Sequence, residues 1–216
     1  MKDNVLTNPI MNALIIADGL NPPGNILRSL CRHKDLIVCA DGGANQARKS
    51  GVHPDIILGD LDSVSSPTLR KFRKIPLMFV DDKNTTDLEK AILYCLSRGA
   101  RSITITGGLG TRIDHATGSL GCLRKYSDRC AMTLYDSLGF LLPVKTSLRI
   151  QTRVGERISL IPLTRCTGIT TKNLKFPLKK ESLELGKREG ISNEATSSSV
   201  SVRLKRGTLL LYRFQE

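Results

Sequence analysis

Residues 54–63 read Pro-Asp-Ile-Ile-Leu-Gly-Asp-Leu-Asp-Ser, an apolar run that ends at a glycine and is followed by two carboxylates. The run predicts a short buried strand. Residues at i and i+2 of an extended or tightly turned segment point to the same side, so Asp60 and Asp62 are expected to face one point beyond the strand. Two such carboxylates repel each other unless a cation lies between them, and Mg²⁺ prefers oxygen ligands. The alternative is a solvated turn, where Asp is common.

Short apolar runs alternate with helical patterns over the first two thirds of the chain. Thr86 and Glu89 fit a capping box at the start of the clearest helix, and Gly99 fits its C-terminal end. Apolar strands that alternate with helices predict an α/β fold with a Rossmann-like parallel sheet and helices on both faces. Strands are expected at 13–17, 36–40, 55–58, 77–80 and 102–106, and helices at 25–33, 44–50, 67–74, 86–98 and 114–126.

The pattern changes at about residue 131, where helical periodicity fades. The remainder predicts an all-β unit, so the expected domains are 1–135 and 136–216. A last strand at 208–214 closely follows Arg206-Gly207, which predicts a hairpin with the strand before it. The polar segment 186–199 is expected to form a loop. The other expected strands lie at 147–152, 157–161, 168–171 and 200–205.

The charge of the chain is uneven. Its 216 residues have a formal net charge of +13, and residues 145–216 hold 15 Lys and Arg against 6 Glu. A basic surface can serve nucleic acid, a membrane surface or an anionic substrate. Four Tyr, five Phe and no Trp are a poor supply of base-stacking side chains, so nucleic acid is not the expected partner.

The sequence predicts a cytoplasmic protein without a membrane span. No run of 18 apolar residues is present, and residues 1–12, expected to form a short leader, lack the basic start and long apolar stretch of a signal peptide. None of the six cysteines forms a C-x-x-C pair, which favours buried thiols in a reducing compartment.

Acidic residues follow every predicted strand of the α/β unit. In open α/β sheets, ligands bind beyond the carboxyl ends of the strands. Glycines after two of these strands, at 42–43 and 107–110, would let phosphate approach backbone N–H groups. Helix capping accounts for some of the acids, but paired acids beside glycines indicate Mg²⁺-nucleotide chemistry. The acids are Asp18, Asp41, Asp60, Asp62, Asp81, Asp82, Asp87 and Asp114.

Four segments together resemble the thiamin pyrophosphokinase family, in order and spacing, over residues 13–126. They are Asp41-Gly42-Gly43-Ala44-Asn45, Gly59-Asp60-Leu61-Asp62-Ser63, Thr86-Asp87-Leu88-Glu89-Lys90-Ala91 and Arg112-Ile113-Asp114-His115. Two further segments, 173–178 and 192–194, resemble the family's thiamin-side motifs more weakly. The combined pattern is specific, whereas each piece alone is not.

The resemblance implies an α/β domain followed by a β-sandwich domain, in a homodimer whose active sites are shared between the α/β domain of one subunit and the β domain of the other. It implies that diphosphate moves from ATP to thiamin with Mg²⁺, releasing AMP. The implied metal ligands are Asp41, Asp60, Asp62 and Asp87, and any of the last three could accept the hydroxyl proton. The implied ATP contacts are Asp41, Gly42, Asn45, Thr86, Arg112, Asp114 and His115. The implied thiamin contacts are Phe176, Ser192 and Asn193.

Three positions depart from the family pattern. Asn84 stands where the family usually has an acid, and Asp81 or Asp82 could take over that role. Thr111 replaces a frequent glycine, and Phe176 replaces a frequent Trp.

Two alternatives remain open at this point. One is another Mg²⁺-dependent nucleotidyltransferase or phosphohydrolase on the same α/β frame, which would need nothing from residues 173–194. The other is a basic nucleic-acid-binding protein, which would be indifferent to the loss of Asp62.

Overall fold

The computed structural model describes residues 12–110 and 112–215, which form two compact units. The first unit comprises residues 12–119, without residue 111, together with 128–131, and the second comprises 120–127 and 132–215. Apart from Asn12, the expected leader lies outside the described residues, as does Thr111.

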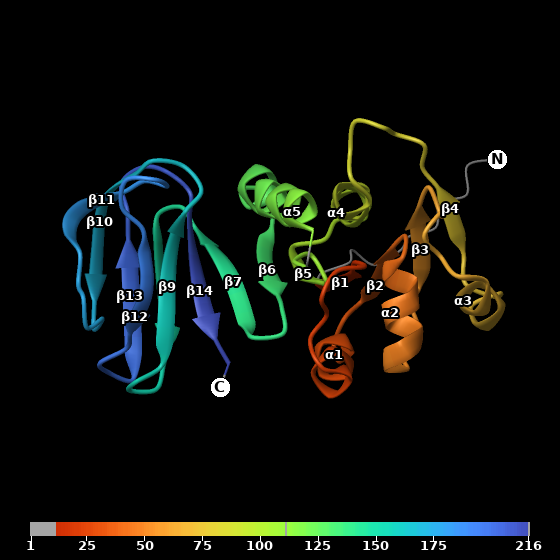
Figure 1. Cartoon of the computed structure of the whole chain (residues 1–216), viewed down its shortest axis with the longest axis horizontal. Coiled ribbons are helices and arrows are strands. Elements are labelled where there is room, and N and C mark those ends of the chain that lie inside the picture. Colours follow the sequence, from red (N-terminus) through yellow and green to blue (C-terminus); the bar gives the residue numbers. More distant parts are fainter. Residues whose placement is uncertain (1–11, 111, 216) are drawn as a thin grey trace. The chain divides into compact units, whose positions relative to one another are not determined.

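Within its described residues, the first unit is built on five parallel strands (Figure 1). Their order in the sheet is β5–β1–β2–β3–β4, so β1 lies between β5 and β2. The strands are β1 (Asn12–Ile16), β2 (Leu36–Ala40), β3 (Ile56–Gly59), β4 (Leu77–Phe79) and β5 (Ser102–Thr106). The helices are α1 (Gly24–Cys31), α2 (Gly43–Ser50), α3 (Ser66–Lys71), α4 (Asp87–Ser97) and α5 (Ile113–Tyr126), whose residues 120–126 belong to the second unit.

Helices cover both faces of this sheet, as predicted. Successive side chains of a strand point to opposite faces. Leu14 and Ile16 of β1 belong to one buried cluster with Leu27 of α1 and with Ala44 and Ala47 of α2. Helix α4 packs against β1, β2 and β3, and it lies on the other face from α1, α2 and α3 (Figure 1). The sheet is therefore buried on both sides, which explains its continuous apolar strands.

The end signals of α4 behave as the sequence predicts. The Glu89 backbone N–H donates to Thr86 Oγ1 at 3.2 Å, which is one half of a capping box. Gly99 follows the helix with φ of 86°, a left-handed conformation that glycine adopts easily. Because α4 begins at Asp87, the cap fixes this carboxylate at the edge of the sheet.

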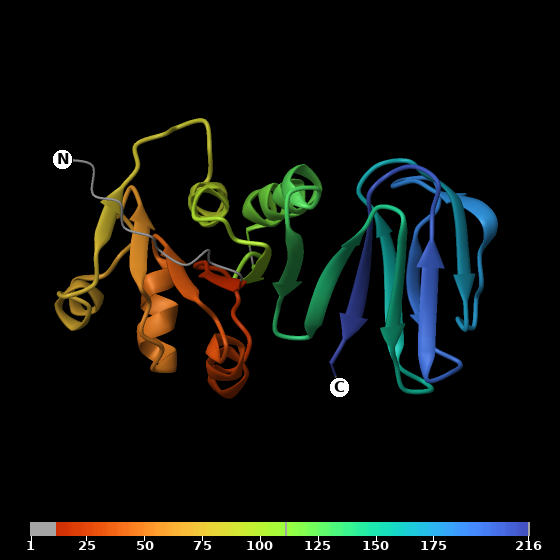
Figure 2. The same cartoon turned by 180° about the vertical axis from the view of Figure 1, so that it is seen from behind.

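The second unit contains two antiparallel sheets (Figure 2). Their side chains share one buried core. One includes β12–β9–β14–β7–β6 in that order, and the other is β11–β10–β13–β8. Ile158 and Leu211 of the first sheet and Ile169 and Val202 of the second lie in one buried cluster, so the β-sandwich is confirmed. The strands are β6 (Ala131–Tyr135), β7 (Gly139–Val144), β8 (Ser147–Gln151), β9 (Arg157–Pro162), β10 (Cys166–Lys172), β11 (Lys179–Leu183), β12 (Gly190–Glu194), β13 (Ser199–Arg203) and β14 (Leu209–Phe214).

Two predictions for this unit are wrong. Strands β13 and β14 do not form a hairpin, because β13 pairs with β8 and β10 whereas β14 pairs with β7 and β9. Both strands bury apolar side chains in the same core from opposite sheets, and the link through Gly207 crosses between the sheets. The predicted loop at 186–199 contains β12. This strand is half exposed and pairs irregularly with β9, so its sequence is polar and shows no apolar alternation that would predict a strand.

Candidate active site

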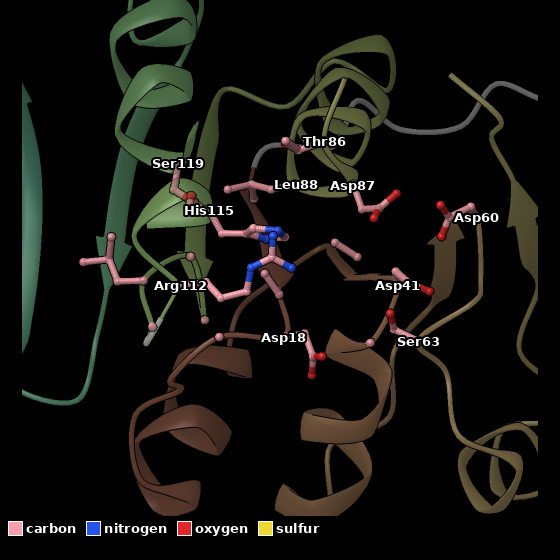
Figure 3. Close-up of a pocket in the computed structure, with 18 of the residues that line it drawn as sticks. Asp18, Asp41, Asp60, Ser63, Thr86, Asp87, Leu88, Arg112, His115 and Ser119 are labelled. Atoms are coloured by element: carbon pink, nitrogen blue, oxygen red, sulfur yellow. The ribbon is translucent and has the colours of Figure 1, made fainter. Parts of the chain in front are cut away.

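A cavity of about 490 Å³ lies beyond the carboxyl ends of β1, β2, β3 and β5 in the first unit (Figure 3). The strand order reverses between β1 and β5, which makes this edge the topological switch point where ligands of open α/β sheets bind. The lining residues come from the loops after these strands, the first turn of α4 and the start of α5. They are Ala17–Gly19, Ala40–Gly42, Asp60, Asp62, Ser63, Thr86–Leu88, Gly107–Gly110, Arg112, His115 and Ser119.

The glycines around the cavity are required by close packing of the loops. A Cβ atom at Gly43 would lie 1.9 Å from the Ile16 carbonyl oxygen, and one at Gly107 would lie 2.1 Å from the Ala17 carbonyl oxygen. The Gly19 N–H donates to the Gly107 carbonyl at 2.9 Å, so the loops after β1 and β5 are bonded to each other. The glycine segments of the sequence therefore bring backbone together at the rim of the cavity.

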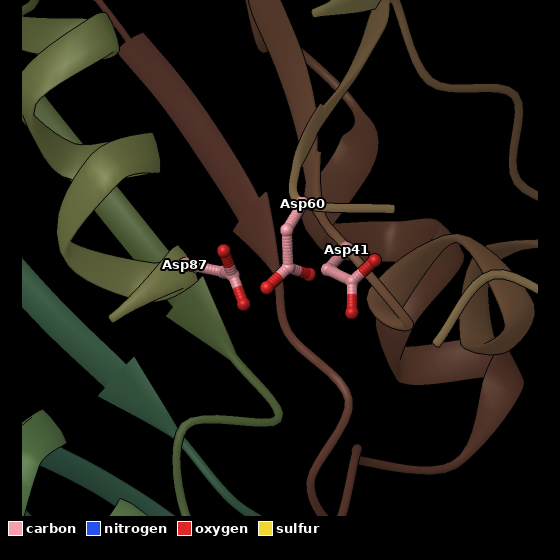
Figure 4. A group of neighbouring side chains, drawn as sticks. All are labelled: Asp41, Asp60 and Asp87. Atoms are coloured by element: carbon pink, nitrogen blue, oxygen red, sulfur yellow. The ribbon is translucent and has the colours of Figure 1, made fainter. Parts of the chain in front are cut away.

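Three carboxylates from three different elements converge at one side of the cavity (Figure 4). Asp41 follows β2, Asp60 follows β3 and Asp87 opens α4, and one oxygen from each lies within 4.8 Å of the others. Gly59 makes this approach possible, because a Cβ atom there would lie 2.9 Å from the Asp41 Cβ and 3.0 Å from Asp87 Oδ1. We refer to Asp41, Asp60 and Asp87 as the carboxylate triad.

The carboxylate triad lacks enough donors among the described residues. The buried Oδ1 atoms of Asp41 and Asp60 have no hydrogen-bond partner there. Burial raises the pKa of Asp41, and the charges of Asp87 and Asp62 add to the effect. Lys90 Nζ donates to Asp87 Oδ1 at 2.9 Å, and the lysine side chain is only 6% exposed. A divalent cation would supply the missing positive charge, so the oxygen donor set fits Mg²⁺.

Asp62 lines the cavity but lies outside the carboxylate triad. The prediction that Asp60 and Asp62 face one point assumed a backbone in which side chains alternate. Leu61 between them has φ of 62°, a left-handed conformation that changes the direction of the chain. Asp62 Oδ1 instead accepts a hydrogen bond of 2.8 Å from Ser63 Oγ.

The predicted nucleotide contacts divide into two groups. Gly42, Thr86, Arg112 and His115 line the cavity, and the side chains of Arg112 and His115 project into it (Figure 3). Asn45 is absent from the lining. Its Nδ2 donates to the Ser63 carbonyl at 2.8 Å, and its Oδ1 accepts from the Ser65 N–H at 3.0 Å and the Ser65 hydroxyl at 2.8 Å. Asn45 therefore fastens the loop after β3 to α2.

Asp114 also lies outside the lining, where it holds Arg112. The Arg112 guanidinium donates to Asp114 Oδ2 at 2.5 Å, and both side chains are more than half exposed. This hydrogen bond lowers the pKa of Asp114 to about 2. A carboxylate that stays ionised orients the guanidinium over a wide pH range.

The acids proposed to replace Asn84 are engaged within their own loop. Asp81 forms an ion pair with Lys83 at 2.7 Å on the surface. Asp82 accepts hydrogen bonds from the Asn84 N–H at 2.9 Å and from Thr85 Oγ1 at 2.8 Å. Neither acid lines the cavity, so the carboxylate triad assembles without them.

The predicted thiamin contacts of the second unit form one local structure. Phe176 is 64% exposed. Asn193 is buried, and its amide donates to the Phe176 carbonyl at 2.8 Å and accepts from the Phe176 N–H at 3.0 Å. Ser192 has φ of 57°, and its N–H donates to Ser159 Oγ at 3.0 Å. Asn193 thus fixes the turn that presents the Phe176 ring to solvent.

Sequence reasoning missed Lys90 as a residue of the site. The signal was present, because residues three apart on a helix are neighbours and Lys90 follows Asp87 at that spacing. An exposed ion pair at this spacing contributes little to stability. Only the burial of Lys90, which the sequence does not reveal, distinguishes this pair from an exposed one.

The chain matches two family models. Residues 27–134 match the model described as thiamin pyrophosphokinase, catalytic domain, and residues 145–209 match that described as thiamin pyrophosphokinase, vitamin B1 binding domain. The chain belongs to the thiamin pyrophosphokinase family. The catalytic-domain match covers the carboxylate triad, and the vitamin B1 binding match covers Phe176 and Asn193.

Individual thiamin pyrophosphokinases agree with the family assignment. Thiamine pyrophosphokinase 1 of Arabidopsis thaliana is 31% identical over an alignment of 202 residues, and the match covers 80% of this chain and 76% of that protein. Thiamine pyrophosphokinase of Bacillus subtilis strain 168 is 28% identical and covers 92% of this chain and 96% of its own. The crystal structure of thiamine pyrophosphokinase from Bacillus subtilis has a TM-score of 0.84 at 25% identity, with 95% of this chain and 99% of that chain covered. In the described part of this chain, every helix is too short or too polar to cross a membrane.

Proposed function

We propose that this protein transfers diphosphate from ATP to thiamin, giving thiamin diphosphate and AMP, with Mg²⁺ bound by Asp41, Asp60 and Asp87. The carboxylate triad carries the proposal, since its two buried Oδ1 atoms find no hydrogen-bond partner among the described residues and a cation would satisfy them. When bound, Mg²⁺ supplies positive charge to phosphoryl oxygens and to the AMP leaving group.

Groups of the chain around the cavity would position the ATP. Arg112 offers a planar set of donors that suits phosphate oxygens, and Asp114 keeps it oriented. Gly42, the N-cap residue of helix α2, lines the cavity, and the start of a helix favours an anion. Lys90 fixes Asp87 through their ion pair. Positioning of this kind provides much of the catalysis in phosphoryl transfer.

Asp62 is the proposed acceptor of the thiamin hydroxyl proton. Asp60 and Asp87 are less suitable, because a cation in the carboxylate triad would stabilise their ionised forms. Asp62 lines the same cavity outside that group, and its one described side-chain partner is the Ser63 hydroxyl. General base catalysis of this kind typically contributes about 10²- to 10⁴-fold to the rate.

The second unit is proposed to bind thiamin. The exposed Phe176 ring can stack on an aromatic ring of thiamin, and the buried Asn193 acts by holding the Phe176 turn. Ser192 lies beside Asn193 and can add a polar contact. In this proposal residues 1–135 bind ATP and Mg²⁺, and residues 136–216 bind thiamin and form the dimer.

A homodimer with shared active sites would bring Phe176 of one subunit to the ATP cavity of the other. Mixing Asp60→Asn protein with Phe176→Ala/Asn193→Ala protein, at a thiamin concentration where each alone turns over slowly, should then raise turnover after subunit exchange, because each heterodimer contains one intact site. No recovery, with exchange verified by mass spectrometry, would contradict the shared site.

A cytoplasmic location is also proposed. All six cysteines lie within the described residues, no disulfide joins them, and five are buried. Thiols of this kind are typical of a reducing compartment.

Two asparagine variants test the assigned roles. Asp60→Asn should weaken the apparent affinity for Mg²⁺ by more than about 100-fold, because even outer-sphere partners of a metal contribute about 10- to 100-fold. Asp62→Asn should lower turnover at saturating Mg²⁺ while leaving the Mg²⁺ dependence nearly unchanged. Normal turnover of Asp60→Asn at low Mg²⁺ would show that the carboxylate triad is not the metal site.

A further inference from the structure

The outward face of the sheet β11–β10–β13–β8 gathers cations that the proposed reaction does not use. Val200 and Val202 of β13 are buried in the core, so Arg203 points outward with the serines beside it. Leu148 and Ile150 of β8 pack on the same core, so Arg149 points outward. The last residue of β10, Lys172, is exposed next to a buried threonine.

The strand register places these cations in one continuous patch. Lys172, Ser201 and Arg149 lie opposite one another in one row across three strands. Thr170 and Ser147 flank Arg203 in the adjacent row. Neighbouring strands are about 4.8 Å apart, so the backbones of Lys172 and Arg149 are about 10 Å apart, with Arg203 between them in the next row about 7 Å along the strands. We call Arg149, Lys172 and Arg203, with the hydroxyl side chains between them, the basic face.

No described acidic side chain neutralises the basic face through an ion pair. Arg149 donates to Ser199 Oγ at 3.3 Å, which leaves its charge uncompensated. The acids described in the second unit all bond to other groups. These pairs are Asp136 with Tyr212, Glu156 with Arg213, Glu181 with Arg188, Glu184 with Lys187, Glu189 with the Gly186 N–H and Glu194 with Lys175.

We propose that the basic face binds the phosphodiester backbone of a nucleic acid duplex, without reading its sequence. Arginine, lysine and hydroxyl side chains are the groups that contact phosphate oxygens in such complexes. The strands of the face expose no aromatic side chain on which unpaired bases could stack, whereas a duplex keeps its bases stacked internally. None of the large apolar side chains exposed among the described residues lies in β8, β10 or β13, so an apolar wedge for a lipid surface is missing.

The number of cations sets the expected salt dependence. Three phosphate contacts on a duplex predict a slope of about −2.7 in a plot of log affinity against log salt concentration. Affinity should therefore fall by roughly 40-fold between about 50 mM and about 200 mM salt. Binding should be equal for duplexes of different sequence, because no base edge is read.

The test measures fluorescence anisotropy of a labelled duplex with the full-length protein across this salt range. The variant Arg149→Gln/Lys172→Gln/Arg203→Gln should lose at least about tenfold in affinity at the lowest salt, and its slope should approach zero. Should that variant fail to fold by circular dichroism, Ser201→Glu places an acid between Lys172 and Arg149 and should weaken binding in the same direction. Formation of thiamin diphosphate should be unchanged in either folded variant.

A matched control removes the same net charge from another part of the second unit. Arg165→Gln/Lys187→Gln/Arg188→Gln changes three cations that are paired with Glu184 or Glu181, and it should bind the duplex nearly as well as the unchanged protein. Equal loss in both triple variants would overturn the proposal, because only net charge would then matter. Tighter binding to vesicles containing anionic phospholipid than to the duplex would also overturn it in favour of a membrane surface.

Discussion

Replacing Gly59 with alanine would place a methyl group between two members of the carboxylate triad. The new Cβ atom would lie 2.9 Å from the Asp41 Cβ and 3.0 Å from Asp87 Oδ1. The Asp41 Cβ is tied directly to the backbone, so the contact can be relieved only if the loop or the two acids move. Gly59 also has φ of 145°, which side chains rarely tolerate, and the strain should lower the free energy of unfolding by about 1–3 kcal/mol.

The expected effect on activity is larger than the effect on stability. A displacement of about 1 Å at a catalytic constellation can reduce turnover about 100-fold. The matched control is Gly51→Ala, since Gly51 also has positive φ, at 70°, but apart from its chain neighbours no described residue has an atom within 4 Å of a Cβ placed there. A non-glycine residue in this left-handed conformation lowers the free energy of unfolding by about 1–2 kcal/mol. The control therefore reproduces the backbone strain without contacting the carboxylate triad.

The assay is urea unfolding with and without Mg²⁺, combined with turnover as a function of Mg²⁺. The unchanged protein and Gly51→Ala should both be stabilised by Mg²⁺, because a ligand that binds only the folded state raises the free energy of unfolding. Gly59→Ala should lose this stabilisation and about 100-fold in turnover. If Gly59→Ala keeps the Mg²⁺ response of the control, the assignment of the carboxylate triad as the metal site is refuted.

Three further results are expected. Lys90→Met removes the ion pair of Asp87, whose side chain is 31% exposed, so the free energy of unfolding without Mg²⁺ should fall by about 1–3 kcal/mol in urea titrations. Added Mg²⁺ should restore part of this loss, and no restoration would contradict a link between Lys90 and the metal site. Burial raises the pKa of Cys95 from 9.0 to about 12, so the free energy of unfolding should decline as pH rises from 9 toward 12; Cys95→Ala should show a smaller decline than the unchanged protein, and parallel pH curves would refute this. Phe176→Ala should raise the KM for thiamin about 2- to 12-fold and leave that for ATP unchanged, whereas equal changes in both would argue against stacking.

The fold of the first unit could be predicted because its signals are local. The bounds expected for β2 and β5 agree with the structure, and the capping box places the start of α4 correctly. Each strand is apolar along its whole length because helices cover both faces of the sheet.

The second unit could be predicted only as a class. Alternating runs identify β-strands, but pairing depends on residues far apart in the chain. The link between β13 and β14 is as short as a hairpin loop and contains a glycine, as hairpin loops often do. It nevertheless crosses from one sheet to the other, because both strands bury apolar side chains in the core between the sheets. Strand β12 has one buried side chain, Asn193, so its sequence lacks an apolar pattern.

The acids at the strand ends were enough to predict where the site lies, but not which of them come together in it. The direction of Asp62 depends on the left-handed conformation of Leu61, which a leucine does not signal. The side-chain amides of Asn45 and Asn193 could bind ligands, but in the structure they form hydrogen bonds that hold neighbouring loops in place. Those contacts form only when segments far apart in the sequence pack together.

The most direct test of the proposed reaction identifies its products. The purified protein would be incubated with ATP, Mg²⁺ and thiamin and followed by ³¹P nuclear magnetic resonance, with a parallel sample lacking thiamin. Equimolar AMP and thiamin diphosphate, absent without thiamin, is the predicted result, because diphosphate transfer cleaves ATP between the α- and β-phosphorus atoms. Release of ADP, orthophosphate or pyrophosphate without thiamin diphosphate would contradict it and indicate a different Mg²⁺-dependent enzyme on the same α/β frame.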